Sequence, residues 1–140
     1  MPATQTKKSL HKRHDDLAQA NKQLEVLSGG IFADGELPTF AKKIKETNQF
    51  PLRPKKLEIL QINVGYMCNQ VCEHCHVDAG PDRKEIMTWE TMEQCLEVIK
   101  NTGAHTLDLT GGAPEMNPNF RRFVEEASKA GIKDFIVRSN

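Results

Sequence analysis

The sequence predicts an α/β core of three parallel strands joined by two helices, preceded by an N-terminal extension. From residue 57 onward, short apolar runs alternate with amphipathic segments in the order strand, helix, strand, helix, strand. Strands that are joined through helices run parallel, with right-handed crossovers. Before residue 57 the chain is polar and is interrupted by glycine and proline. We therefore divide the 140 residues into a mostly helical and irregular extension at 1–56 and an α/β core at 57–140.

The extension contains one candidate helix. Leucines near helical spacing predict a helix over residues 10–28, ended by Gly29 and Gly30. Prolines 38, 51 and 54 then indicate irregular chain. The extension holds 11 Lys and Arg against 6 Asp and Glu, whereas the core holds 8 against 13. This asymmetry fits either an acidic partner or a solvated extension packed on the oppositely charged core.

The first half of the core is predicted as a strand and a helix. The apolar run at 57–64 is the strand, and it ends at Gly65. A helix follows, capped by Thr88 and closed by Gly103. Its apolar positions recur at helical spacing and include Cys95, which we interpret as a buried structural thiol. These positions are Met92, Cys95, Leu96 and Ile99.

The second half repeats the pattern. A strand at 106–110 leads into Gly111 and Gly112. Asn117 is predicted to cap the second helix and Pro118 to begin it, with Gly131 at its end. Its apolar face consists of Phe120, Phe123, Val124 and Ala127. A third strand at 135–137 stops at Ser139 and Asn140.

Three cysteines follow the first strand at the spacing C-x3-C-x2-C, as Cys68, Cys72 and Cys75. A single loop with this spacing can give one thiolate to each of three irons of a [4Fe-4S] cluster. Such a cluster normally has four cysteine ligands, so one iron would stay open to a small chelating molecule. A structural zinc site completed by His74 or His76 is the alternative. Zinc sites more often use two separated ligand pairs, which favours the cluster.

The composition agrees with a metal site in a reducing compartment. Three of the four cysteines lie within eight residues, which argues against a disulfide framework. There is no apolar run of membrane-span length and no apolar segment typical of a signal peptide. We therefore expect a cytoplasmic protein without a membrane partner. No arginine and aromatic pattern accompanies the basic extension, so no nucleic-acid partner is expected either.

The cysteine spacing, together with the run Gly111-Gly112-Ala113-Pro114 after the second strand, resembles the radical SAM superfamily. The longer runs at 63–70 and 76–81 are more specifically similar to the arsenosugar-biosynthesis radical SAM/Cys-rich family. The resemblance covers roughly residues 57–140. It implies that the core is the first half of a partial (β/α)6 barrel, so we expect a fragment of a longer protein that folds loosely or aggregates alone.

The resemblance also implies cofactors and residue roles. The cofactors are a [4Fe-4S] cluster on the three cysteines and S-adenosylmethionine (SAM). The paired glycines would meet the amino group of SAM, and His74 occupies the position that usually lies near its adenine. Ser139 and Asn140 would contact its carboxylate or ribose, although a plain turn explains them equally well. The family often has a glutamate directly after the glycines; here that position is Ala113 and the first acid is Glu115.

The implied activity is reductive cleavage of SAM to a 5′-deoxyadenosyl radical, with an electron donor such as a flavodoxin or a ferredoxin. In the arsenosugar family the small-molecule substrate is a methylated arsenical, which receives the 5′-deoxyadenosyl group. Two alternatives stay open. One is a radical SAM enzyme that modifies a peptide or another small molecule, and the other is a non-catalytic metal-binding fragment.

Overall fold

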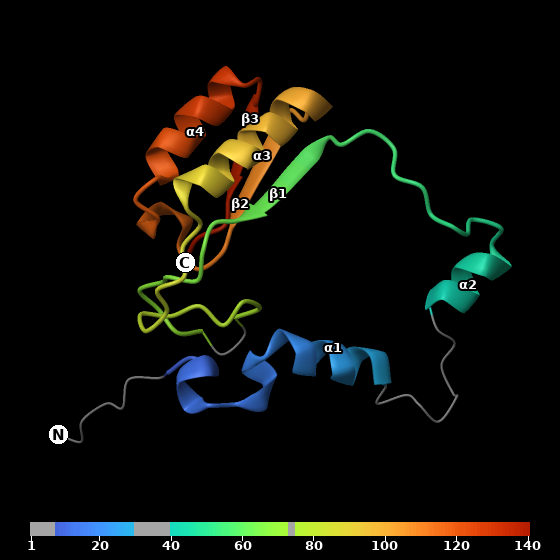
Figure 1. Ribbon diagram of the computed structural model, residues 1–140, viewed down its shortest axis with the longest axis horizontal. Helices are drawn as coiled ribbons and strands as arrows, with labels where there is room; N and C mark the ends of the chain where they lie inside the picture. The colour runs from blue at the N-terminus through green and yellow to red at the C-terminus, as the bar shows by residue number, and fades with distance from the viewer. Residues whose placement is uncertain (1–7, 30–39, 73–74) are drawn as a thin grey trace.

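The computed structural model describes residues 8–29, 40–72 and 75–140. Its core is a sheet of three parallel strands in the order β1-β2-β3, which confirms the predicted fold class. The strands are β1 (Ile59–Asn63), β2 (Thr106–Thr110) and β3 (Asp134–Val137). Helix α3 (Trp89–Thr102) joins the first two, and α4 (Phe120–Lys129) joins the last two. Both helices lie on the same side of the sheet (Figure 1).

The hydrophobic core lies between the sheet and these two helices. Strand β2 is central and is paired on both sides, which is why its first four residues are all buried. Leu107 and Leu109 of β2 are fully buried, as is Phe123 of α4. The other core members on the strands and helices are Ile62, Met92, Leu96, Ile99 and Ala127. The helical spacing of the apolar residues therefore predicted the packed faces of both helices.

Helix α3 has the ends that the sequence predicts. The Thr88 hydroxyl accepts the N–H of Thr91 at 3.4 Å. Gly103 adopts a left-handed conformation with φ 67° and donates its N–H to the carbonyl of Ile99. Cys95 is partly buried and packs against the core, and burial raises the pKa of its thiol.

Helix α4 begins at Phe120, so the prediction that Pro118 begins it was wrong. Asn117 is committed elsewhere: its side-chain amide donates to the carbonyls of Val64 and Met87, each at 3.0 Å. Its Oδ1 accepts the N–H of Asn119 at 2.9 Å, which shapes a turn ahead of the helix. A short 3-10 helix, η3 (Pro114–Met116), precedes this turn.

The two outer strands differ slightly from the prediction. Strand β1 is shorter than the predicted 57–64, although Val64 still donates its N–H to the carbonyl of Thr110 at 3.0 Å. Strand β3 begins at Asp134, one residue before the predicted start.

The extension differs more. The single helix expected at 10–28 is instead three pieces: η1 (His11–Arg13), η2 (Asp16–Ala18) and α1 (Ala20–Gly29). His14 adopts a left-handed φ of 56° after η1, which interrupts any continuous helix. Leu24 is 62% exposed, so the leucine spacing does not mark a buried stripe here.

The rest of the extension contains one unexpected helix and several residues that the structure does not describe. A short helix, α2 (Phe40–Glu46), lies where irregular chain was expected. Gly30, Pro38 and the side chains of Leu17 and Leu27 are outside the description.

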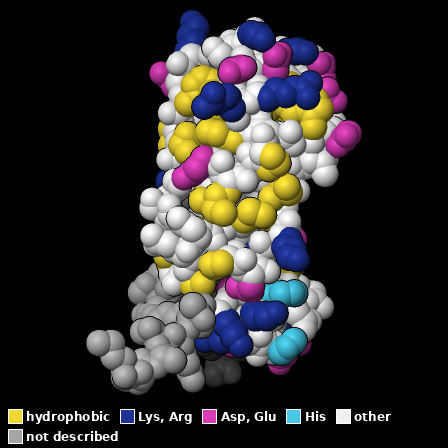
Figure 2. All heavy atoms as spheres, turned by 90° about the vertical axis from the view of Figure 1, so that its left-hand side faces the viewer, with side chains coloured by type: hydrophobic (Ala, Val, Ile, Leu, Met, Phe, Trp, Pro, Cys, Tyr) yellow, Lys and Arg dark blue, Asp and Glu magenta, His cyan; other side chains and the backbone are white. Residues whose placement is uncertain are grey.

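Segments far apart in the sequence meet at one end of the molecule. Figure 1 shows η1 and α1 next to the loop that follows β1, whereas α2 lies away from the sheet. On the face drawn in Figure 2, charged side chains of both signs surround small hydrophobic areas. Histidine side chains on that face lie together with Lys and Arg at its lower end. Among the described residues, no helix has the length and apolar character needed to span a membrane.

We expect Asn117→Ala to lower the free energy of unfolding by about 2 kcal/mol, because the substitution removes two enclosed hydrogen bonds. The Val64 carbonyl keeps the N–H of Met87 as a donor, whereas the Met87 carbonyl loses the amide of Asn117. Urea unfolding followed by circular dichroism measures the change. The control is Asn101→Ala on the exposed side of α3, which should change stability by less than about 0.5 kcal/mol. Equal unfolding midpoints for both variants would contradict the role assigned to Asn117.

Candidate metal and cofactor site

The three cysteines lie on a long loop that leaves the carboxyl end of β1. The loop folds back on itself through two isolated bridges, Gly65 with Ile86 and Met67 with Gly80. Tyr66 contributes to both sides of this fold: its N–H donates to the carbonyl of Glu85 at 2.8 Å and its carbonyl accepts the N–H of Gly80 at 3.1 Å. Cys68 is thereby held at the carboxyl edge of the sheet, where parallel α/β folds bind their ligands.

The turn after β2 packs directly on the backbone of this loop. Gly112 donates its N–H to the carbonyl of Gly65, and Ala113 donates to that of Met67, both at 2.9 Å. A Cβ on Gly111 would lie 2.4 Å from the Gly65 carbonyl oxygen, and one on Gly112 would lie 2.3 Å from that of Met67. Gly111 also has a φ of +139°, which side-chain-bearing residues rarely adopt. The paired glycines are therefore required to bring the turn against the cysteine loop.

Cys68 is the most enclosed of the three cysteines. Its side chain is buried with Ala79 and Ala113 in a small apolar cluster. Its sulfur accepts the N–H of Gln70 and the side-chain amide of Asn140, each at 3.5 Å. Asn140 also donates to the side-chain oxygen of Asn69, so the residue after β3 binds the cysteine loop at two points.

Cys75 and Cys72 are less enclosed. The sulfur of Cys75 accepts the N–H of Ala79 at 3.2 Å, and its side chain packs against the same apolar cluster as Cys68. Cys72 is exposed. In the part of the chain that the structure describes, no three His, Cys, Asp or Glu side chains converge closely enough to hold a metal ion. The three thiols would therefore have to move together to hold one group.

The donor set nevertheless fits a group held by thiolates. All four cysteines of the chain are free thiols, and three of them are on one loop. The sulfurs of Cys68 and Cys75 both accept N–H groups, and such hydrogen bonds stabilise negative charge on a metal-bound sulfur. The arrangement can supply three thiolates at the edge of the sheet.

Of the other predicted SAM-binding residues, Ser139 and Asn140 are described by the structure and His74 is not. Ser139 lies beyond β3 and donates its hydroxyl to Glu115 at 2.6 Å, so these two side chains meet near the glycine turn. Asn140 reaches Cys68, as described above. His74, predicted to lie near the adenine of SAM, is outside the described residues.

A buried polar group lies within the sheet, around Asp108. Asp108 of β2 is 4% exposed and accepts hydrogen bonds from Gln61 at 2.8 Å and Arg138 at 2.9 Å. The Arg138 guanidinium holds the pKa of this carboxyl below its usual range, so Asp108 is ionised at neutral pH. Leu107 and Leu109 on either side of it face the helices, which places Asp108 on the opposite face of the sheet.

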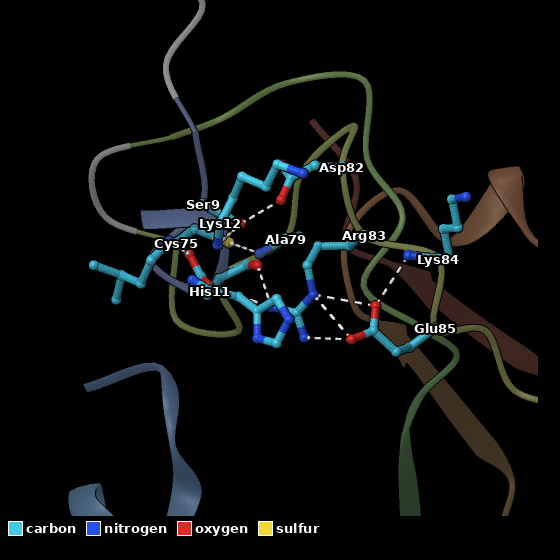
Figure 3. Close-up of polar contacts among 11 residues, drawn as sticks. Ser9, His11, Lys12, Cys75, Ala79, Asp82, Arg83, Lys84 and Glu85 are labelled. Carbon is cyan, nitrogen blue, oxygen red and sulfur yellow. Dashed lines mark hydrogen bonds and ion pairs between the residues drawn. The ribbon is translucent and has the colours of Figure 1, made fainter. Parts of the chain in front are cut away.

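Sequence reasoning missed a charged group on the same loop, formed by Asp78, Arg83 and Glu85. Asp78 and Arg83 hydrogen-bond to each other, and Arg83 also binds Glu85 (Figure 3). The Arg83 hydrogen bond lowers the pKa of Glu85 to about 2. The local signal was the run Asp78-Ala79-Gly80-Pro81, whose residue types favour turns. The partners of Asp78 in the extension, Leu10 and His11, lie more than 60 residues away in the sequence. No periodic pattern in the sequence indicates this contact.

Comparison with known proteins identifies the family to which this chain is similar. Residues 62–140 match the model of the radical SAM superfamily. Curated relatives named probable GTP 3′,8-cyclase match over 86 residues. The identities are 24% for Sulfolobus acidocaldarius, 28% for Saccharolobus islandicus and 29% for Methanothermobacter marburgensis. These matches cover 61% of this chain and 28% of each relative. Because the family model covers more than half of the chain, including the cysteine loop, both helices and strands β2 and β3, the chain belongs to the radical SAM superfamily.

Proposed function

We propose that this chain is the cluster-binding and SAM-binding part of a radical SAM enzyme. The carrying observation is the loop with Cys68, Cys72 and Cys75, packed on the Gly111-Gly112 turn at the carboxyl edge of a parallel sheet. Proteins of this superfamily generally bind a [4Fe-4S] cluster and SAM. The narrow packing of turn on loop supports a shared site, because it brings two neighbouring strand ends to the same place.

Each part of the site has a role in this proposal. The three cysteines would hold the cluster, which would supply the electron for reductive cleavage of SAM to methionine and a 5′-deoxyadenosyl radical. Three protein ligands, one fewer than the usual four, would leave a place for the amino and carboxylate groups of SAM. Carbonyl groups of the Gly111-Gly112 turn accept hydrogen bonds from the SAM amino group. Ser139 and Asn140 offer polar groups to its carboxylate or ribose, and His74 contacts the adenine.

For the substrate, we propose a methylated arsenical, which receives the 5′-deoxyadenosyl group. The support is the similarity of residues 63–70 and 76–81 to the arsenosugar-biosynthesis family. A flavodoxin or a ferredoxin would deliver the electron. A nucleotide is the second candidate, because relatives named probable GTP 3′,8-cyclase match 61% of this chain. The chain spans about 28% of the length of those relatives, so their names bear on the shared part alone.

We expect anaerobic reconstitution with iron and sulfide to give a brown protein with about four irons per chain. Cys72→Ala should remove most of the visible absorbance, because a cluster with two protein ligands is not retained. Cys95→Ala is the matched control, since Cys95 packs against the core of α3 and the sheet, and it should keep the absorbance. A colourless protein with one zinc per chain would instead favour a structural zinc site.

We expect SAM to change the electron paramagnetic resonance spectrum of the reduced protein, because the open iron gains nitrogen and oxygen ligands. With reductant present, an enzyme that contains this chain should convert a methylated arsenical to a product with both arsenic and the 5′-deoxyadenosyl group, detected by mass spectrometry. GTP serves as the competing substrate in a parallel reaction. A spectrum that does not respond to saturating SAM would exclude SAM binding by this chain, and consumption of GTP alone would replace the arsenical proposal.

We expect Gly112→Ala to impair iron uptake, because the added Cβ displaces the backbone next to Cys68. Strain of this kind costs about 1–3 kcal/mol, so the melting temperature should fall as well. Gly103→Asn is the control, because nothing lies within 4 Å of a Cβ there and asparagine adopts the left-handed conformation readily. Full iron loading of Gly112→Ala would show that the close packing of turn on loop does not matter to the site.

A further inference from the structure

The carboxylate of Asp78 joins the N-terminal segment to the cysteine loop. Its Oδ1 accepts the N–H of Leu10 at 2.6 Å and its Oδ2 accepts the N–H of His11 at 2.9 Å. Arg83 completes the set, donating to Oδ2 at 3.2 Å and to the Asp78 backbone carbonyl at 2.8 Å. The N–H groups at the start of η1 thus meet a carboxylate that also binds a guanidinium.

Ser9 provides a second attachment on the same loop. Its hydroxyl donates to Asp82 at 2.6 Å and accepts the N–H of Lys12 at 3.2 Å. Ser9 is 1% exposed and Asp82 is partly buried, so this contact is partly shielded from water. The hydrogen bond from Ser9 lowers the pKa of Asp82, and the carboxylate is ionised at neutral pH. Residues 9–13, here called the clasp, are therefore fixed to the loop at Asp78 and at Asp82.

The clasp acts at the turn that holds Cys75. The N–H of Asp78 donates to the carbonyl of Cys75 at 3.3 Å, and the next N–H, that of Ala79, donates to its sulfur at 3.2 Å. Asp78 has a left-handed φ of 50°, which turns the following peptide back toward Cys75. Fixing the Asp78 side chain from outside therefore fixes the peptide group that donates to the sulfur.

Arg83 links this turn to the base of the loop. Its guanidinium lies 4.7 Å from the centre of the Tyr66 ring and 3.0 Å from the Glu85 carboxylate. Its side chain is 10% exposed, so both of its ion pairs are partly shielded from water. Partly buried charge networks of this kind contribute modestly to net stability, but they can define one geometry where several would otherwise compete.

We propose that Asp78 is a positioning residue for the metal centre: it binds the clasp and thereby holds the Ala79 N–H on the sulfur of Cys75. The identity of the metal group rests on the proposed function. Docking of the clasp and retention of the cluster are then coupled. By reciprocity, the cluster must protect the clasp from opening as much as the clasp protects the cluster from loss.

Two variants separate this role from general folding. Asp78→Asn keeps the left-handed backbone, which asparagine tolerates as well as aspartate. It replaces one of the two acceptor oxygens by an NH2 group, which cannot accept the N–H of Leu10 or His11. Ser9→Ala removes the attachment to Asp82 and changes no residue of the cysteine loop. The control is Glu25→Gln on α1, which breaks an exposed ion pair with Lys22 at the same end of the chain.

The measurements are amide hydrogen exchange of residues 9–13, the rate of iron transfer from the reconstituted full chain to a chelator, and the midpoint potential of the cluster. We expect both variants to accelerate exchange in the protein without metal and to speed iron loss about 10-fold, as for other residues that orient metal ligands. The potential should fall, because an N–H donor to a ligand sulfur stabilises the reduced cluster. Glu25→Gln should leave all three unchanged.

The outcomes distinguish this proposal from the proposed function. Faster exchange in the clasp with unchanged iron loss and potential would show that the clasp is a structural contact alone, and would overturn the positioning role. Unchanged exchange would overturn the clasp itself. If the wild-type chain takes up zinc rather than iron, the proposed function fails, and the positioning role is judged on the rate of zinc release in the same variants. If it takes up neither metal, both fail.

Discussion

The close packing of the Gly111-Gly112 turn on the cysteine loop is the contact on which the rest of the site depends. Two backbones approach there until neither glycine can accept a Cβ, and two N–H groups of the turn donate to carbonyls of the loop. Hydrogen bonds between main-chain groups hold position better than long side chains, because few rotatable bonds separate them from the sheet. These hydrogen bonds therefore fix the backbone next to Cys68 relative to β1 and β2.

The predictable parts of the molecule are those with local chemistry. Apolar spacing predicted α3 and its face, and Thr88 and Gly103 predicted its ends, because caps depend on neighbouring residues. Asn117 misled the prediction, since its amide binds carbonyls 30 and 53 residues away instead of a nearby helix end. Residues 10–28 misled it for a related reason: the leucine spacing is helical, but the conformation of His14 breaks the helix.

The site divides in the same way. The spacing of Cys68, Cys72 and Cys75 is visible in the sequence, because one loop carries all three. Paired glycines are also visible, but a Cβ on either of them would meet the backbone of the cysteine loop, and a sequence does not name that neighbour. In the sequence, nothing distinguishes Asp78 and Arg83 from ordinary surface residues. They gain a role through Ser9, Leu10 and His11, which only folding brings to them.

The clasp has a consequence for the order of folding. Ser9 and Asp82 are 73 residues apart in sequence, so their contact closes a long loop and carries a correspondingly large entropy cost. Contacts at such separation form late, after local helices and neighbouring strands have reduced the freedom of the intervening chain. Residues 9–13 leave the ribosome well before their docking surface exists. The clasp is therefore synthesised before the cysteine loop but is among the last segments to reach its native position, and it docks on a loop that is already shaped by the sheet.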